Sequence, residues 1–437
     1  MTVMPNHATP PATLTRTNMI GVVAGNVLEF YDFTLFAFFA PQIGATMFAH
    51  GKGTDGLLLA LATFAVGFIA RPIGAVAIGR YADRRGRKPA MVLSFALMGV
   101  ALIVVAITPP SSMLGVWSAV ILAAARLVQG FALGGEVGPT TALLIEAAPA
   151  GRRGLYGAWQ IASQGIAVLI AGLVGLAISF LLSPQAVIDW GWRIGMLLGA
   201  LILPIGFHLR RIMPETLDAP GQEAIDRAAA ALPLAQVATI GLLLILAGTV
   251  TTYTLQYFNT YSIAVLKLEP SLAFTTTAIT GGSMFAFGLL GGWISDRIGR
   301  RPVIILPRIL LLLLIYPVFV RILAAPSLGT LSLGVFLLTA LYAMSTATAN
   351  VCLAESFPRA RRSTAYALVY TLAVSVFGGS AQFAITWLIK QTGNPMMPAW
   401  WLLGATMVGI LAGAAMPMIQ TARSRIRHPD PATTSVG

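Results

Sequence analysis

The chain contains the stretch Gly79-Arg80-Tyr81-Ala82-Asp83-Arg84-Arg85-Gly86-Arg87-Lys88-Pro89, which returns 213 residues later as Gly292-Trp293-Ile294-Ser295-Asp296-Arg297-Ile298-Gly299-Arg300-Arg301-Pro302. A second stretch repeats in the same way. Glu146-Ala-Ala-Pro149-Ala-Gly-Arg152-Arg153 is echoed 209 residues later by Glu355-Ser-Phe-Pro358-Arg-Ala-Arg361-Arg362. Two repeats at nearly the same offset, close to half the chain length, indicate an internal duplication. The sequence therefore predicts two related halves.

The composition excludes a soluble globular surface. Of the 437 residues, 57% are hydrophobic and only 10% are charged, and the mean hydropathy is +0.81. Apolar runs of roughly 20 residues match the ~30 Å hydrocarbon core of a bilayer, at a helical rise of 1.5 Å per residue. We predict an all-α membrane protein with six spans in each half, at residues 19–42, 57–80, 90–108, 115–147, 154–182, 192–212, 234–266, 271–294, 302–323, 328–356, 362–390 and 397–420.

The net charge of +13 is distributed unevenly along the chain. With the N-terminus placed in the cytoplasm, nineteen Lys and Arg residues fall on the inner side. Five fall on the outer side, namely Lys52, Arg193, Lys267, Arg321 and Lys390. Such a bias orients helices in a membrane. We interpret the basic charge as a topology signal with both termini cytoplasmic, and we expect no nucleic-acid partner.

The segments outside the spans complete the expected domain organisation. Residues 1–18 form a polar tail without the features of a cleaved signal peptide, so the first helix is expected to remain. We expect a six-helix bundle at 19–212, a cytoplasmic linker at 213–233, a second six-helix bundle at 234–420 and a cytoplasmic tail at 421–437. The single cysteine, Cys352, excludes a disulfide framework and a thiolate metal cluster. Neither a cofactor nor a metal is expected.

The doubled motif Gly-x-x-x-Asp-Arg-x-Gly-Arg-Lys/Arg resembles the signature loop of the major facilitator superfamily. This resemblance implies twelve transmembrane helices in two pseudo-symmetric six-helix bundles, and secondary transport by alternating access. Shorter stretches resemble the metabolite:proton symporter branch, which carries citrate, 2-oxoglutarate, shikimate and osmolytes such as proline and betaine. These stretches are Gly25-Asn26-Val27-Leu28-Glu29-Phe30-Tyr31-Asp32-Phe33, Arg71-Pro72-Ile73-Gly74, Arg126-Leu127-Val128-Gln129-Gly130, Gly134-Gly135-Glu136-Val137-Gly138 and Trp190-Gly191-Trp192-Arg193-Ile194. Two more, 251–261 and 393–401, are most similar to citrate and tricarballylate carriers.

Acidic residues at matched positions of the repeats indicate a gate. Arg and Lys alone could anchor helix ends in the cytoplasmic interface, but acidic residues contribute little to orientation. We therefore expect ion pairs and helix-end contacts that close the inner mouth in one conformation and break in the other. The candidates are Gly79, Asp83, Arg84, Gly86, Arg87, Glu136, Glu146, Arg152, Arg153, Asp296, Arg297, Gly299, Arg300, Glu355 and Arg361. For Glu136, gating and transport remain equal alternatives.

Charged residues inside spans are functional candidates because each costs at least ~2.5–3.5 kcal/mol at bilayer depth. Glu29 and Asp32 lie one helical turn apart on the first span, and Arg126 lies at a similar depth on the fourth. Protonation of one carboxylate could release Arg126 to bind a substrate carboxylate bidentately. The alternative is a structural ion pair between the two helices. Arg71 is either a second anion ligand or a partner of Asp32.

Polar side chains complete the candidate binding site. Tyr253, Gln256, Tyr257, Thr260 and Tyr261 form a stripe along the seventh span, which predicts a cavity lining and not an interfacial aromatic belt. Hydroxyl and amide groups of this kind can bind hydroxyl and carboxylate oxygens. The further candidates are Asn26, Gln129, Gln160, Gln164, Asn350, Tyr366 and Tyr370.

These observations favour a transporter over an enzyme. The sequence has no Gly-x-x-x-x-Gly-Lys-Ser/Thr phosphate loop of an ATP-driven pump and no catalytic constellation. We predict proton-coupled symport of a small organic anion, citrate or a related carboxylate, by a monomer in a bacterial inner membrane. Another substrate of the branch is the alternative, and Na⁺ coupling stays open.

Overall fold

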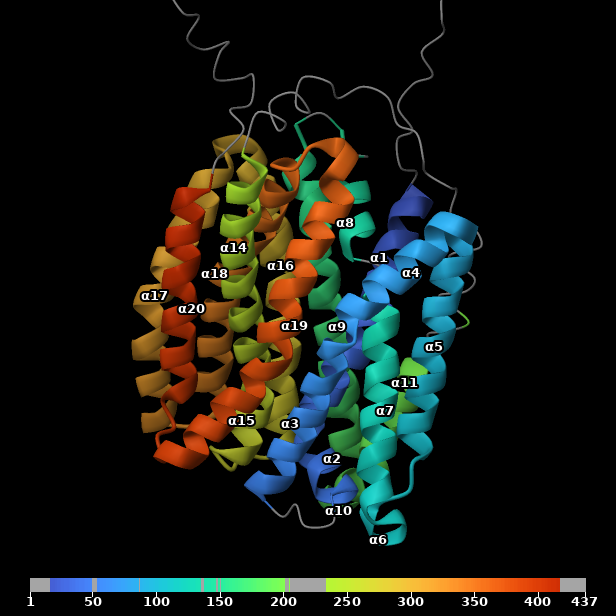
Figure 1. Cartoon of the computed structure of the whole chain (residues 1–437). Helices are drawn as coiled ribbons and strands as arrows, with labels where there is room; N and C mark the ends of the chain where they lie inside the picture. Colours follow the sequence, from blue (N-terminus) through green and yellow to red (C-terminus); the bar gives the residue numbers. More distant parts are fainter. Residues whose placement is uncertain are drawn as a thin grey trace, which may run out of the picture.

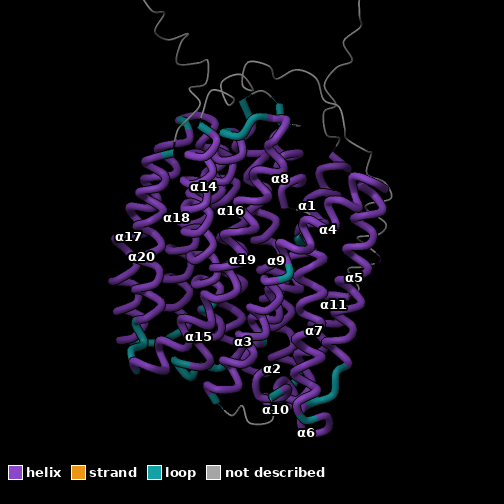
Figure 2. The backbone as a smooth tube through the Cα atoms, viewed as in Figure 1, coloured by secondary structure: helices purple, strands orange, loops and turns teal. Residues whose placement is uncertain are grey.

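The computed structural model describes residues 16–48, 53–85, 87–134, 137–146, 148–149, 151–200, 204 and 233–416, and within these ranges its regular structure is helical, without strands. The helices run roughly side by side, and the described loops gather mainly at the two ends of the bundle (Figures 1 and 2). The first described helix begins, and the last one ends, at the upper end in Figure 1. We call this the repeat-loop end, because the loop between Ile298 and Arg300 lies there.

The first half contributes the blue to green helices of Figure 1. They are α1 (Arg16–Phe38), α2 (Ala40–Met47), α3 (Thr54–Ile69), α4 (Arg71–Arg85), α5 (Arg87–Ile107), α6 (Ser111–Leu114), α7 (Val116–Leu133), α8 (Val137–Glu146), α9 (Arg153–Leu181), α10 (Pro184–Ala186), a π-helical turn η1 (Val187–Gly191) and α11 (Trp192–Ala200). The predicted sixth span is described only as far as Ala200.

The second half lies beside it in yellow to red. Its helices are α14 (Leu234–Gln256), α15 (Phe258–Ala264), α16 (Pro270–Ile298), α17 (Arg300–Ala324), α18 (Leu328–Glu355), α19 (Arg359–Thr392) and α20 (Met397–Ala415). Ten stretches of the described chain are long and apolar enough to cross a membrane, and a shorter apolar helix covers Val92–Ile107. The predicted linker at 213–233 lies outside the described residues except for Pro233.

Four of the predicted spans are each divided into two helices. The break in the span at 115–147 includes residues outside the described part, and the other three breaks are described. α1 ends before Phe39, α3 ends before Ala70, and α14 gives way to α15 at Tyr257. Pro41 and Pro72 follow the first two breaks; a proline has no N–H to donate and fits the first turn of a new helix. Broken helices in transporters often line the binding site. The second and third breaks place Arg71 and Tyr257 beside helix ends.

The two halves meet closely along α9 and α16. A Cβ added to Gly281 would lie 2.2 Å from the Leu169 backbone nitrogen, and one added to Gly165 would lie 2.5 Å from the Phe285 nitrogen. At the repeat-loop end, a Cβ on Gly292 would lie 2.4 Å from the Gly154 carbonyl oxygen. Glycine lets helix backbones approach in this way. The interface between the halves is therefore a seam of small residues that runs along both helices.

Candidate functional site

A buried ion pair joins α1 to α7 in the first half. The Asp32 Oδ1 and Arg126 Nη2 atoms lie 3.7 Å apart, with the side chains 1% and 0% exposed. Neither Asp32 oxygen, and none of the three Arg126 guanidinium nitrogens, has a hydrogen-bond partner among the described residues. The guanidinium instead lies 3.8 Å from the centre of the Phe36 ring. The predicted meeting of these two charges is present, but without the hydrogen bonds that usually accompany a buried pair.

The position of Arg126 follows from close packing of α3 against α7. A Cβ on Gly130 would lie 1.6 Å from the Gly67 carbonyl oxygen, and one on Gly67 would lie 3.1 Å from the Arg126 carbonyl oxygen. The two backbones therefore touch at the level of Arg126. This contact fixes the helix that carries the cation, although the guanidinium itself has no hydrogen bond to hold it.

A second buried cation, Arg71, lies in an aromatic cluster. Its guanidinium lies 4.5 Å from the ring centre of Phe33 and 4.3 Å from that of Phe68. Cations are attracted to the faces of aromatic rings. Arg71 also interacts electrostatically with Tyr253 of the second half, whose ring packs edge-on against Phe68. Arg71 therefore lies where the halves meet, and Asp32 pairs with Arg126 and not with Arg71.

The remaining first-half candidates lie around α1 and α9. Glu29 is 3% exposed and acts electrostatically on Tyr370 of α19, so it too faces the second half. Asn26 donates through Nδ2 to the Ser163 hydroxyl at 2.5 Å and to the Gln160 carbonyl at 3.4 Å. The Nδ2 group of Asn26 thus ties α1 to α9 in this conformation. Only the side-chain oxygen of Asn26 remains available to bind a ligand.

Buried amides without partners surround this region. Both side-chain polar atoms of Gln129 and of Gln160 lack a hydrogen-bond partner among the described residues, as does Nε2 of Gln164. A buried polar group without a partner costs about 1–3 kcal/mol. Gln129 lies one turn from Arg126 on α7, and Gln160 and Gln164 lie on α9, where the Gln160 carbonyl contacts Asn26. These side-chain groups are available to a polar ligand.

The predicted stripe on the seventh span is buried throughout, with every member 7% exposed or less. The Tyr257 hydroxyl accepts from Thr386, and the Tyr261 hydroxyl donates to the Pro395 carbonyl, so both are engaged inside the second half. Thr260 donates to the Ala37 carbonyl at 3.4 Å, across the two halves. The break at Tyr257 divides the stripe, and Tyr253 is the member nearest to Arg71. Gln256 and Asn350 are buried, and Tyr366 stacks on Tyr370.

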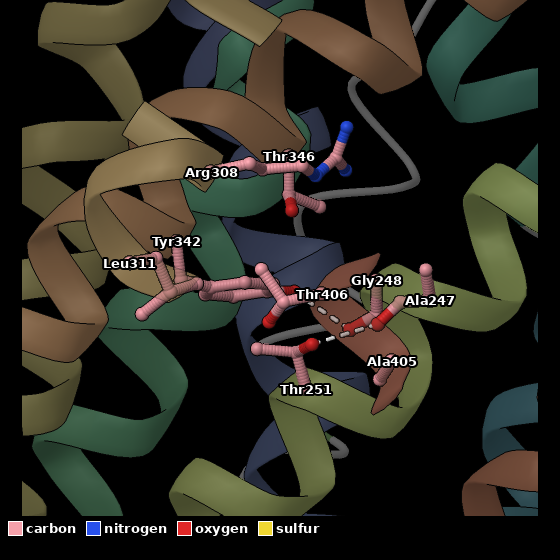
Figure 3. A pocket seen from close by; sticks show the side chains of 9 residues that line it. All are labelled: Ala247, Gly248, Thr251, Arg308, Leu311, Tyr342, Thr346, Ala405 and Thr406. Atoms are coloured by element: carbon pink, nitrogen blue, oxygen red, sulfur yellow. Dashed lines mark hydrogen bonds between the residues drawn. The ribbon is translucent and has the colours of Figure 1, made fainter. Parts of the chain in front are cut away.

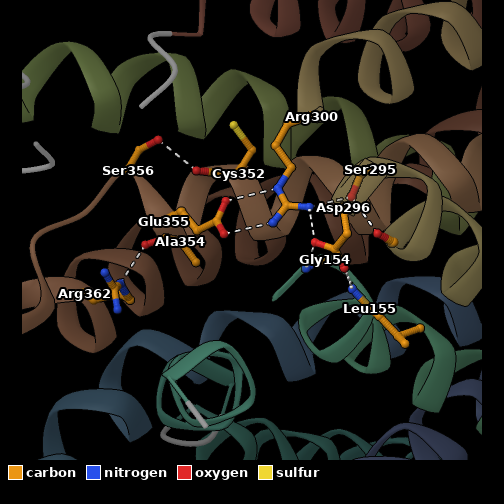
Figure 4. A network of polar contacts seen from close by, with 11 residues as sticks. Gly154, Leu155, Ser295, Asp296, Arg300, Cys352, Ala354, Glu355, Ser356 and Arg362 are labelled. Carbon is orange, nitrogen blue, oxygen red and sulfur yellow. Dashed lines mark hydrogen bonds and ion pairs between the residues drawn. The ribbon is translucent and has the colours of Figure 1, made fainter. Parts of the chain in front are cut away.

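At the repeat-loop end, Asp296 connects the halves. Its Oδ1 accepts a hydrogen bond from the Gly154 N–H at 2.7 Å and its Oδ2 accepts one from the Leu155 N–H at 2.9 Å (Figure 4). Both donors belong to the first turn of α9, where N–H groups have no partner within the helix and favour negative charge. A carboxylate of the second half thus caps a helix of the first.

Arg300 ties this contact to a second carboxylate. Its Nη1 lies 2.9 Å from Asp296, and its Nε and Nη2 donate to both Glu355 oxygens at 3.1 and 3.0 Å (Figure 4). The fork geometry is the strong form of an arginine–carboxylate pair. Gly299 makes the turn between α16 and α17 with φ +94°, a conformation that side-chain-bearing residues rarely adopt. Both repeat motifs of the second half therefore meet in one network.

A second bridge between the halves pairs Glu146 of α8 with Arg362 of α19, at 3.0 Å. Arg362 also donates through Nε to the Ala354 carbonyl. The sequence nominated Arg361 for the gate, and the neighbouring Arg362 makes this contact. The repeat pattern contains both residues, so the echo of Arg152-Arg153 could have identified Arg362.

The other gate candidates lie at exposed or half-buried positions or outside the described part. Arg84 and Arg152 are exposed, and Arg297 lies 3.3 Å above the Trp293 ring on its own helix. Arg153 is half-buried at the start of α9. Gly86 and Glu136 lie outside the described residues, and for Gly79, Asp83, Arg87 and Arg361 only the helix that contains them is described.

At the opposite end, the halves are joined by an exposed pair. Lys390 of α19 contacts Asp55 of α3, with side chains 42% and 62% exposed. Such exposed pairs contribute about 0–1 kcal/mol. In this conformation the halves touch at both ends, through a partly buried network at one and an exposed pair at the other.

Comparison with known proteins decides the family. The family model described as Major Facilitator Superfamily matches residues 22–381. The chain belongs to the major facilitator superfamily. It is therefore a multi-pass membrane transporter with the twelve-helix major facilitator fold, as the sequence predicted.

Individual relatives of this major facilitator protein differ in their cargo. The chain is 34% identical over 413 residues to the citrate-proton symporter of Salmonella typhi, covering 93% of this chain and 95% of that one. It is 29% identical over 440 residues to the proline/betaine transporter of Escherichia coli, covering 94% and 85%. The fold resembles the xylose transporter XylE from E. coli in a partially occluded inward-open conformation, with a TM-score of 0.72, 17% identity and coverage of 92% and 96%.

Proposed function

We propose that this protein is a proton-coupled symporter of a small organic anion, citrate or a related di- or tricarboxylate. The observation that carries the proposal is the Asp32–Arg126 pair, which is buried, in contact and without hydrogen bonds. A guanidinium held this loosely can exchange its carboxylate partner for that of a substrate. The similarity to a citrate-proton symporter over 93% of the chain supports the same cargo.

The proposed coupling follows from charge balance. A proton on Asp32 removes the negative partner of Arg126, which then binds a substrate carboxylate through its two N–H edges. Arg71 supplies a second positive charge beside Tyr253, and the free amides of Gln129 and Gln160 supply further hydrogen bonds. Glu29, one turn from Asp32 and facing α19, is a second proton acceptor that links occupancy to the position of the halves.

The gate sets which side of the membrane reaches the site. We propose that the Asp296–Arg300–Glu355 network and the Glu146–Arg362 pair close the cytoplasmic mouth, and that they break when the halves rock apart at that end. Asp55 and Lys390 would part in the opposite movement. The free energy of several charge-assisted contacts is of the size needed to bias a two-state equilibrium of a few kcal/mol.

The remaining assignments complete the proposal. The transporter acts as a monomer in a bacterial inner membrane, coupled to H⁺ with Na⁺ as the alternative ion, with both termini and the 213–233 linker in the cytoplasm. The tail at 1–18, the bundles at 19–212 and 234–420, and the tail at 421–437 are the proposed divisions of the chain. The charge asymmetry of the loops supports this orientation.

The second candidate cargo is another substrate of the branch, such as 2-oxoglutarate, shikimate or an osmolyte, because a proline/betaine transporter is also similar over most of the chain. The two buried cations, Arg71 and Arg126, favour a multiply charged anion over a zwitterion. Counterflow of labelled citrate in proteoliposomes, with unlabelled citrate, 2-oxoglutarate, shikimate and betaine as competitors, separates the candidates. Exchange of betaine without exchange of citrate would overturn the cargo assignment.

A further inference from the structure

A third buried arginine lies inside the second half, away from the Asp32–Arg126 site. Arg308 is the ninth residue of α17, about 12 Å along the helix from Arg300 at 1.5 Å per residue, and its side chain is 4% exposed. Within the described part of the chain, its one hydrogen bond runs from Nη1 to the Gly409 carbonyl of α20 at 3.4 Å. No carboxylate of the described residues forms an ion pair with it.

The charge at this position is not part of the duplicated scaffold. The offset that relates the two signature loops places Phe95 at the matching position of the first half, and Phe95 is buried like Arg308. An aromatic side chain satisfies the packing there. A cation buried without a counter-charge carries a large desolvation cost. Packing alone therefore does not explain an arginine at position 308.

The guanidinium borders a small cavity between α14, α17, α18 and α20 (Figure 3). The cavity has a volume of about 10 Å³, and its polar lining consists of Arg308, Thr251, Tyr342, Thr346 and Thr406. A space of this size holds about one particle as large as a water molecule. A di- or tricarboxylate does not fit in it, which separates this site from the proposed substrate site.

The polar side chains that line the cavity include hydrogen-bond donors but no carboxylate. The Thr406 hydroxyl, 2% exposed, has no hydrogen-bond partner among the described residues. The Tyr342 hydroxyl lies beside Arg308, but it donates to the Gly248 carbonyl at 3.2 Å and contacts the Thr252 hydroxyl, so its proton is already used. An arginine keeps its proton in proteins. The site therefore presents one positive charge and the unpartnered hydroxyl of Thr406.

We propose that this cavity binds a single halide ion, chloride in the cell, held by Arg308 and Thr406. A single halide ion fits the space, neutralises the guanidinium and accepts hydrogen bonds from the Arg308 and Thr406 side chains. A water molecule would fit but would leave the charge uncompensated. The bound ion would join α14, α17, α18 and α20, and so stabilise the second half independently of cargo and coupling.

Thermal unfolding of the purified full chain tests the site. Sodium chloride is replaced stepwise by sodium gluconate at constant Na⁺ and ionic strength, and then chloride by bromide. We expect Tm to rise with chloride and to saturate, by about 2 °C or more at ten times the dissociation constant, with bromide as effective as chloride. Arg308→Gln should abolish the response. Arg321→Gln, an exposed arginine on the same helix, should retain it.

A milder variant keeps the test decisive if Arg308→Gln does not fold. Thr406→Val removes one donor and should move the chloride midpoint to about tenfold higher concentration. A wild-type Tm that does not depend on halide would show that the cavity holds only water, and would overturn the proposal. An equal halide response in the wild type and in Thr406→Val would attribute it to the protein surface and overturn the proposal as well. Neither result would bear on the proposed symport.

Discussion

Asp32 and Arg126 face each other across α1 and α7 with 3.7 Å between Oδ1 and Nη2, and none of their polar atoms makes a hydrogen bond within the described structure. A buried pair that served only to hold two helices together would be expected to satisfy its donors and acceptors, because unsatisfied charges weaken a fold. The two charges are close enough to neutralise each other, but no hydrogen bond holds either side chain in one position. Such a geometry suits a partner exchange during transport.

Removing one member of this pair should cost stability as well as transport. Arg126→Gln and Asp32→Asn each leave an uncompensated buried charge, and each should lower the free energy of unfolding by about 3–5 kcal/mol. The double variant should recover most of that loss while its counterflow of citrate stays about 100-fold below the wild type. Thermal unfolding and counterflow on the same preparations measure both. Transport by the double variant at the wild-type rate would assign the pair a purely structural role.

Glu29 should separate coupling from binding. Glu29→Gln keeps the size and hydrogen-bonding capacity of the side chain but cannot release a proton. We expect citrate exchange at the wild-type rate and a loss of uptake driven by a pH gradient, both measured in proteoliposomes. Glu269→Gln, an exposed glutamate at the start of α16, is the matched control and should leave both rates unchanged. Normal pH-driven uptake by Glu29→Gln would remove this residue from the proton path.

The gate should open when its central carboxylate is neutralised. Val351 is buried against α9, where it would touch a Cβ on Gly157, so a cysteine there reports separation of the halves. In a Cys352→Ser background, Val351→Cys should react slowly with a maleimide, and adding Asp296→Asn should accelerate the reaction by about 5–150-fold. Lys390→Gln, which breaks the exposed pair at the other end, is the control.

The Lys390→Gln control distinguishes the two ends of the molecule. Lys390→Gln should not accelerate labelling at Val351→Cys, because it weakens the end remote from the probe. If Asp296→Asn labelled no faster than its parent, the contacts of Asp296 with α9 would not hold the cytoplasmic end closed.

The glycine seam should discriminate between adjacent residues. An added Cβ at Gly281 would lie 2.2 Å from the Leu169 nitrogen, whereas one at Gly282 has no atom within 4 Å. Gly281→Ala should therefore force α9 and α16 apart, destabilise the protein by about 1–3 kcal/mol and slow transport. Gly282→Ala should have little effect on Tm or counterflow. Equal Tm values for the two variants would contradict the close approach of the helices.

The features that depend on short stretches of sequence could be predicted from the sequence alone. Hydropathy located the spans, and the duplicated loops pointed to Asp296, Arg300 and Glu355, which the structure brings into one network. Counting residues along two helices also brought Asp32 and Arg126 to one depth. Each of these inferences needs only helical geometry and the orientation of the chain.

The rest depends on how the helices pack. The pairing of Arg362 with Glu146 depends on the packing of α19 against α8, which the sequence pattern does not contain. Asn26 stays a predicted ligand residue, and it is the approach of α9, which the sequence pattern does not contain, that brings Ser163 to its amide. Arg308 was not among the residues predicted to be functional, although an arginine in the middle of an apolar run indicates a functional site. The cavity that Arg308 borders is formed only when four helices pack around it.

The central claim is coupled transport of an organic anion, and uptake under an imposed pH gradient tests it most directly. Proteoliposomes with an alkaline interior, in Na⁺-free buffer, should accumulate labelled citrate above its external concentration, and a protonophore should abolish the accumulation. The Asp32→Asn variant should not accumulate citrate under the same gradient. Accumulation that requires Na⁺, or that survives the protonophore, would contradict the account.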